Sequence, residues 1–165
     1  MDRLDRKILR LLQEDSTLAV ADVAKKVGLS TTPCWRRIQK LEEEGVIRRR
    51  VAVLDPAKVN VRVNVFVSIR TSSHSHEWLR RFSEVVQEFP EVVEFYRMSG
   101  EVDYLLRVVV PDIAAYDMFY KRLIQKIEIR DVSSAFAMEQ IKNTTELPLD
   151  YLVLDKETGA SSRAA

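Results

Sequence analysis

Residues 28–41 read Gly28-Leu29-Ser30-Thr31-Thr32-Pro33-Cys34-Trp35-Arg36-Arg37-Ile38-Gln39-Lys40-Leu41. Ser30 or Thr31 can cap the start of a helix, and Pro33 then falls in the first turn, where its missing N–H does no harm. Cys34, Ile38 and Leu41 follow at the spacing of one helix face. The stretch therefore predicts a helix that begins after a glycine break, with an apolar side turned inward and a basic side turned outward.

Two further helices are predicted before this stretch. Leu4, Ile8, Leu11 and Leu12 recur at helical spacing in a segment that ends near residue 15. Residues 20–27 form a second short helix whose inward positions are Val23, Ala24 and Val27. Gly28 ends it, because a C-terminal cap needs a positive φ and glycine adopts one at the least cost.

The segment that follows the third helix is basic and alternating. Residues 46–54 read Val-Ile-Arg-Arg-Arg-Val-Ala-Val-Leu, a pattern that indicates a strand pair or wing, and Asp55-Pro56 marks a turn. Three helices followed by a basic hairpin predict a winged helix-turn-helix over residues 1–60. In such a domain the third helix enters the major groove of DNA.

The residue types on the third helix and the wing suit a nucleic-acid contact. Hydroxyl groups and free N–H groups at the helix start can bind phosphate or base edges, and cations follow at adjacent turns. The residues expected at DNA are Ser30, Thr31, Thr32, Pro33, Arg36, Arg37, Lys40, Arg48, Arg49 and Arg50. A basic amphipathic helix is also a common solvated face, so a domain that contacts a protein partner instead of DNA stays open.

Charge is distributed unevenly along the chain. Residues 1–54 hold twelve Lys and Arg against eight Asp and Glu, a net charge of +4. Residues 55–165 hold fourteen against seventeen, a net charge of −3. A basic first part and an acidic second part indicate that only the first part meets an anionic polymer.

The second part of the chain changes its hydrophobic period. Strands are predicted at residues 61–69, 92–98, 104–110 and 132–138, and helices at residues 78–89 and after Pro111-Asp112. The order β-α-β-β-α-β is typical of the ferredoxin-like sandwich. The predicted fold class is therefore α+β, with a ferredoxin-like domain over residues 61–150 and a small, polar, mobile tail over residues 151–165.

Several function classes lack the residues they need. One cysteine, Cys34, forms no intrachain disulfide, and its place on the inward stripe favours a buried apolar role. His74 and His76 are too few for a metal site, so no metal is expected. No nucleophile–base pair or phosphate loop is found, which argues against an enzyme. No apolar run is long enough to span a membrane and no signal segment is evident, so we expect a cytoplasmic protein.

Two separate motifs resemble one known family. Leu4-Asp5-Arg6-Lys7-Ile8-Leu9, Val27-Gly28-Leu29-Ser30, Thr32-Pro33-Cys34 and Arg37-Ile38-Gln39-Lys40-Leu41-Glu42 resemble the leucine-responsive/asparagine-type (Lrp/AsnC, feast/famine) regulators, as does Ser99-Gly100-Glu101-Val102-Asp103-Tyr104-Leu105-Leu106. The resemblance covers about residues 1–150. It implies a DNA-binding transcription regulator of amino-acid metabolism that dimerises through its sheet domain and assembles to tetramers or octamers.

The resemblance also implies an amino-acid effector, bound near the Ser-Gly-x-x-Asp turn. Residues 31–35, 116–123 and 133–142 are similar to the cysteine-responsive subgroup, which favours cysteine, while leucine, another amino acid or no ligand stay open. Residues 127–129 lie where many members have a Pro-Gly turn. No other cofactor is implied.

An amino-acid zwitterion needs donors for its carboxylate and an acceptor for its ammonium group. Gly100 allows a close approach to the backbone, N–H groups of the turn can bind the carboxylate, and Asp103 can bind the ammonium. The expected effector residues are Ser99, Gly100, Glu101, Asp103, Tyr104, Ser133 and Ser134. A plain hairpin turn capped by Asp103 is the alternative that the residues alone favour. The alternative function is an oligomeric ligand-binding module that contacts a protein partner.

Overall fold

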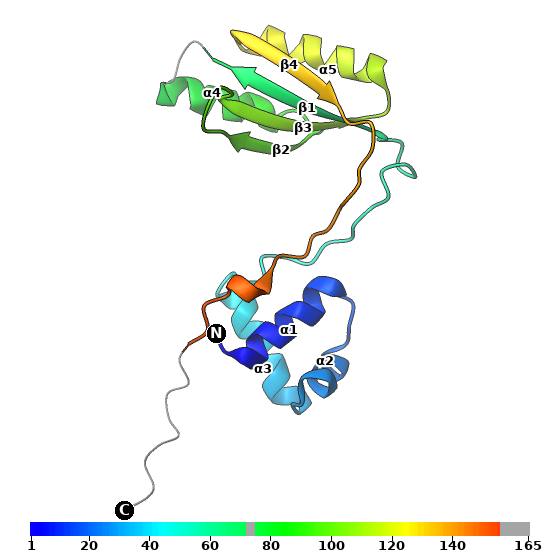
Figure 1. The fold of residues 1–165 in the computed structure, drawn as a ribbon, viewed down its shortest axis with the longest axis vertical. Helices are drawn as coiled ribbons and strands as arrows, with labels where there is room; N and C mark the ends of the chain where they lie inside the picture. Colours follow the sequence, from blue (N-terminus) through cyan, green and yellow to red (C-terminus); the bar gives the residue numbers. More distant parts are fainter. Residues whose placement is uncertain (72–74, 156–165) are drawn as a thin grey trace, which may run out of the picture. The chain divides into compact units, whose positions relative to one another are not determined.

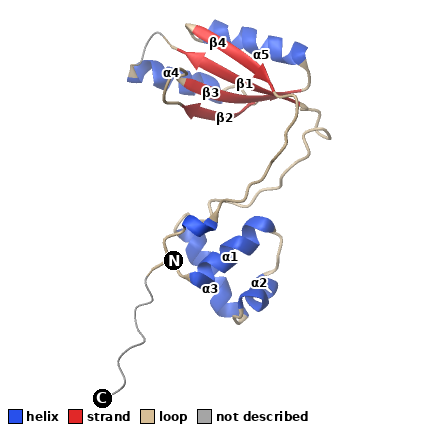
Figure 2. Ribbon diagram, in the orientation of Figure 1, coloured by secondary structure: helices blue, strands red, loops and turns tan. Residues whose placement is uncertain are grey.

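The computed structural model describes residues 1–71 and 75–155, and they form two units (Figure 1). The first unit contains residues 1–52 together with residues 142–155 of the described chain, and the second contains residues 53–141. The first unit is helical, and all four strands belong to the second (Figure 2). Among the described residues, no helix has the length and apolar character that crossing a membrane requires.

The helical unit consists of α1 (Arg3–Glu14), α2 (Val20–Val27) and α3 (Thr31–Glu43). These confirm the three helices expected from the apolar spacing. A capping box fixes the start of α1: the Asp2 carboxylate accepts from the backbone N–H of Asp5, and the Asp5 carboxylate accepts from that of Asp2. The core of the unit is made of Ile8, Leu9, Leu12, Val23, Ala24, Val27, Cys34, Ile38 and Leu41.

The turn between α2 and α3 sets the direction of the third helix. Gly28 adopts φ +77°, as its predicted capping role requires, and the Leu29 N–H donates to the Ala24 carbonyl at 2.9 Å. Ser30, in an extended conformation, is the N-cap residue of α3. The break and the new start lie three residues apart, so α2 and α3 pack against each other as a helix-turn-helix pair.

The strand pair expected over residues 46–54 does not form. The Ile47 N–H donates to the Leu41 carbonyl at 3.0 Å, but no backbone hydrogen bond joins residues 48–54 to another described segment. A strand requires a neighbour that satisfies its N–H and C=O groups, and the unit offers none. Val51, Val53 and Leu54 are exposed, with 70% of Val53 open to solvent.

The second unit is a four-stranded antiparallel sheet covered on one face by two helices (Figure 1). Its strands are β1 (Val63–Arg70), β2 (Val92–Arg97), β3 (Tyr104–Val110) and β4 (Asp131–Phe136), in the order β2-β3-β1-β4. The helices are α4 (His76–Gln87) and α5 (Ile113–Lys126). The element order confirms the predicted ferredoxin-like arrangement.

Buried and more exposed side chains alternate along the central strands, so the two faces of the sheet differ. β3 alternates between buried and half-buried side chains throughout, so one face packs against α4 and α5. Tyr104 belongs to this core, where its ring lies 5.5 Å from that of Trp78 and 5.3 Å from that of Phe82. The opposite face carries a polar cluster in which Arg107 donates to Glu94 at 2.8 Å and to Asn64 at 3.1 Å, beside the exposed rings of Phe66 and Tyr96.

The chain after β4 returns to the helical unit. The Gln13 side chain pairs with both backbone groups of Leu147, at 3.0 and 3.1 Å, and Leu149 packs against the helical core. Residues 149–151 form a short 3-10 helix, and the Asp155 carboxylate binds the Met1 ammonium group. The sequence analysis assigned residues up to 150 to the sheet domain, whereas the contacts of residues 142–155 place them in the helical unit. Most of the predicted tail, residues 156–165, lies outside the described residues.

Candidate nucleic-acid interface and ligand site

The outer side of α3 is polar and exposed. Cys34, Ile38 and Leu41 face the core, and the exposed side chains include Thr31, Thr32, Pro33, Arg36 and Lys40. All five were expected at DNA. Lys40 forms a long ion pair, with its Nζ 3.6 Å from Glu44 Oε1, and 72% of its side chain is exposed. The helix therefore presents hydroxyls at its start and cations one turn later on a surface that is open to a ligand.

The N-terminus of α3 keeps donors available. Ser30 occupies the N-cap position, but its hydroxyl makes no capping hydrogen bond. The first turn contains no acidic side chain, and Pro33 has no N–H to satisfy. Free N–H groups and the positive end of the helix dipole make such a terminus favourable for a phosphate.

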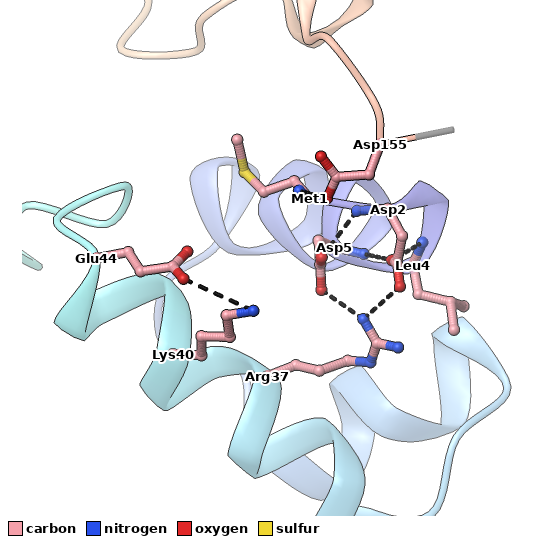
Figure 3. Close-up of polar contacts among 8 residues, drawn as sticks. All are labelled: Met1, Asp2, Leu4, Asp5, Arg37, Lys40, Glu44 and Asp155. Atoms are coloured by element: carbon pink, nitrogen blue, oxygen red, sulfur yellow. Dashed lines mark hydrogen bonds and ion pairs between the residues drawn. The ribbon is translucent and has the colours of Figure 1, made fainter. Parts of the chain in front are cut away.

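Arg37 is turned away from this surface, toward α1 (Figure 3). Its Nη1 donates to Asp2 and to Asp5, at 2.7 Å in each case. The Asp5 side chain is only 14% exposed and that of Arg37 is 32% exposed. The sequence grouped Arg37 with the DNA contacts; the structure places its charge between two carboxylates that belong to the capping box of α1. We call Arg37, Asp2 and Asp5 the α1–α3 clamp.

The clamp shifts the pKa of Asp2 and that of Arg37. Burial opposes the charged form of Asp2, but the backbone N–H of Asp5 and the Arg37 guanidinium outweigh it and lower the pKa of this carboxyl. The hydrogen bond to Asp5 raises the pKa of Arg37, against a smaller effect of burial. Both shifts favour the ion pair, so the clamp holds α3 against the start of α1 across the neutral pH range.

The three arginines after α3 differ in their contacts. Arg50 donates to Glu42 at 3.0 Å and to the Ser16 carbonyl at 3.4 Å, which anchors the segment to α3 and to the α1–α2 loop. Arg48 and Arg49 are exposed, and neither forms an ion pair within the described chain. Their charges are therefore available to an anionic partner.

A second site lies at the turn between β2 and β3. Gly100 adopts φ +109°, which strains any residue with a Cβ. The Met98 N–H donates to the Asp103 carbonyl at 2.8 Å, and the Asp103 carboxylate accepts from the Thr71 N–H, also at 2.8 Å. Beside this turn is an open hollow of about 350 Å³, lined by Arg70, Thr71, Gly100, Glu101, Asp103 and Arg130.

The hollow includes some of the expected effector residues and omits others. Gly100, Glu101 and Asp103 line it. Ser99 lies in the same turn but outside the lining, and Tyr104 is in the core. Ser133 lies opposite Ser68 in the sheet, and the Ser134 hydroxyl is hydrogen-bonded to that of Tyr116.

Three lining residues were missed by the sequence analysis: Arg70, Thr71 and Arg130. The end of β1 pairs antiparallel with the starts of both β3 and β4, so these residues meet the turn only through the strand register. The Arg130 N–H donates to the Arg70 carbonyl at 3.2 Å, which holds the two arginines side by side. Guanidinium groups suit a carboxylate, and the carboxylates of Glu101 and Asp103 suit an ammonium group. In the structure Arg70 donates to the Glu101 carboxylate at 3.1 Å.

Cys34 and the possible metal ligands are further reactive groups among the described residues. Cys34 is fully buried, and burial raises the pKa of its thiol, so its reactive thiolate form is suppressed. Within residues 1–71 and 75–155, no cluster of His, Cys, Asp or Glu has the number of ligands that a metal ion needs.

Comparisons with known proteins match both units. Residues 1–48 match the model described as winged helix-turn-helix DNA-binding, and residues 64–147 match the Lrp/AsnC ligand binding domain. The chain is 52% identical over 151 residues to the DNA-binding transcriptional activator DecR of Escherichia coli. The aligned residues make up 91% of this chain and 99% of that protein.

Two solved structures share the fold over nearly the whole chain. An AsnC family transcriptional regulator from Agrobacterium tumefaciens is 87% identical with a TM-score of 0.90, covering 93% of this chain and 100% of that one. A transcriptional regulator from Neisseria meningitidis, in complex with L-Met, is 34% identical with a TM-score of 0.88, covering 93% of this chain and 99% of that one.

Proposed function

Since this chain belongs to the Lrp/AsnC family of transcription regulators, we propose that α3 binds operator DNA and that an amino acid held beside Gly100 and Asp103 changes that affinity. The protein is a DNA-binding regulator with an amino-acid effector domain. The observation that supports the proposed DNA site is the outer side of α3, where Thr31, Thr32 and Arg36 are exposed next to an N-terminus with free donors.

The effector hollow favours a small polar amino acid. Its lining among the described residues is polar or charged except for Gly100, so it offers nothing to pack against a leucine side chain. The similarity of three segments to the cysteine-responsive subgroup favours cysteine as the effector. Arg70 and Arg130 would bind the carboxylate, and Asp103 would accept from the ammonium group.

A dimer is needed for the proposed mechanism. The face of the sheet opposite α4 and α5 carries the exposed Phe66 and Tyr96 around the Arg107–Glu94 pair, which suits a self-complementary contact. Two copies of α3 would then bind half-sites about 34 Å apart. The effector would alter how the dimers associate or orient, and so the affinity for DNA.

Salt dependence tests the proposed DNA contact. Each phosphate neutralised contributes about −0.9 to the slope of log Kobs against log salt. Arg48→Ala and Arg49→Ala each remove one cation that would neutralise a phosphate, so we expect each to make the slope less negative by about that amount. Fluorescence anisotropy with a duplex selected from random DNA measures the slope. Arg80→Ala is the control, since Arg80 is exposed on α4 in the other unit.

The proposal predicts an unchanged slope for Arg80→Ala. Equal slopes for the wild type, Arg48→Ala and Arg49→Ala would remove both arginines from the interface. Absence of binding to any duplex at low salt would overturn the DNA site altogether and favour a protein partner.

A further inference from the structure

Trp35 is an apolar side chain on the polar side of α3. The exposed fraction of Trp35 is 46%. By contrast, Cys34 and Ile38, which lie on the core face of the same helix, are buried. Among the described residues, the apolar side chains that pack against the core of this unit do not include Trp35. A tryptophan ring that is exposed among polar side chains offers an apolar contact surface to a partner.

Gln39 lies one turn further along α3, on the same side as Trp35. It is half-buried, and within the described part of the chain its amide makes no hydrogen bond. Thr32, Arg36, Gln39 and Glu43 follow at the spacing of one helix face, opposite Cys34 and Leu41. Gln39 therefore lies on the side of α3 that would face the floor of a groove.

We propose that Trp35 and Gln39 read base edges in the major groove, with Trp35 against the methyl group of a thymine and Gln39 hydrogen-bonded to an adenine. This inference rests on the proposed function and adds the sequence preference of the same helix. Apolar side chains contact the thymine methyl group, and a glutamine amide matches the N6 and N7 atoms of adenine.

The spacing of the two residues agrees with this assignment. Four residues along a helix advance about 6 Å, close to two base-pair steps of about 3.4 Å. Trp35 and Gln39 would thus reach base pairs two steps apart and favour an A·T-rich site. Arg36 and Lys40 lie beside them, where cations would contact the flanking phosphates and fix the register.

The α1–α3 clamp explains why Trp35, and not Arg37, lies on the side of α3 that would face the groove. Arg37 follows Trp35 by two residues and is turned to Asp2 and Asp5 at 2.7 Å (Figure 3). With α3 fixed against α1 through Arg37, the residues on the far side of the helix, including Trp35, are held outward. The orientation of the reading side is therefore set by a contact within the helical unit.

Atom-level changes in the DNA test the inference. A high-affinity duplex is selected from random sequences with the full-length wild-type protein, and each thymine is replaced in turn by deoxyuridine, which removes only the methyl group. Each adenine is replaced in turn by 7-deazaadenine, which removes N7. Affinities are measured by fluorescence anisotropy at fixed salt for the wild type, Trp35→Ala, Gln39→Ala and Lys40→Ala.

For the wild type we expect at least one uracil position and one deazaadenine position two base-pair steps away to weaken binding by about tenfold. Trp35→Ala should lose sensitivity to the uracil change alone, and Gln39→Ala to the deazaadenine change alone. Lys40→Ala should weaken binding to every duplex by the same factor, because a phosphate contact carries no sequence information.

Two outcomes would overturn the inference, and a third would overturn the proposed function on which it rests. A wild type that tolerates every uracil and deazaadenine change would show that neither atom is read. A Trp35→Ala variant that keeps the full uracil penalty would assign the methyl contact to another residue. Failure of the wild type to select any duplex would instead overturn the proposed function itself. Circular dichroism of each variant checks that the helices remain intact.

Discussion

Arg37→Ala should destabilise the helical unit by about 2 kcal/mol, the scale of a hydrogen bond to a charged group in a half-buried setting. The Arg37 guanidinium lies 2.7 Å from both Asp2 and Asp5, and its removal leaves two neighbouring carboxylates without their common partner. Because local opening governs amide exchange, we expect the slowest amides of α1 and α3 to exchange about thirtyfold faster.

Arg36→Ala is a closely matched control. It lies next to Arg37 on α3 and loses the same charge, but its side chain is exposed and makes no ion pair within the described chain. We expect Arg36→Ala to weaken DNA binding without changing amide exchange. If Arg37→Ala instead leaves exchange in α1 and α3 unchanged while DNA binding falls as in Arg36→Ala, the clamp has no structural role and Arg37 is a direct DNA contact.

Asp103→Asn should lower the affinity for the amino-acid effector by tenfold or more, with DNA binding in its absence unchanged. The substitution keeps an oxygen that can accept from the Thr71 N–H at the position now 2.8 Å away, so the turn is preserved. It removes the negative charge that would face the ammonium group, a contact worth about 1.5–3 kcal/mol. Isothermal titration calorimetry with cysteine measures the decrease in affinity.

Asp117→Asn provides the comparison for this experiment. Asp117 is on α5, where it pairs with Lys121 at 2.6 Å, outside the hollow. The affinity for cysteine should be that of the wild type in this variant. An Asp103→Asn protein that binds cysteine as tightly as the wild type would remove Asp103 from the site, whatever the behaviour of Asp117→Asn.

The helical elements were predictable because their signals are local. Gly28, Ser30 and the apolar spacing of Cys34, Ile38 and Leu41 act within a few residues, and the structure confirms the helix bounds they predicted. The direction of Arg37 was not predictable in this way. It depends on Asp2 and Asp5, more than thirty residues earlier, which the capping box brings to the same place.

The residues of the candidate sites also differ in whether their signal is local. The turn at Gly100 and Asp103 carries its own sequence signal, but Arg70 and Arg130 join it only through the register of β1 with β3 and β4. The alternation of residues 46–54 predicted a strand pair or wing, and the structure assigns no strand there. Strand formation requires a partner segment, which the sequence pattern does not supply. Hydrophobic period predicts elements; contacts between distant segments depend on topology.

The amino-acid hollow and α3 are coupled in the proposed mechanism, and thermodynamic linkage provides a direct test. Cysteine should change the affinity for the selected duplex, and the duplex should change the affinity for cysteine by the same factor, typically 5- to 150-fold for coupled sites. Anisotropy measures the first and calorimetry the second, at one salt concentration. We expect two equal factors that differ from one. A duplex affinity that is identical with and without saturating cysteine, and with every other common amino acid, would show that the two sites are not coupled.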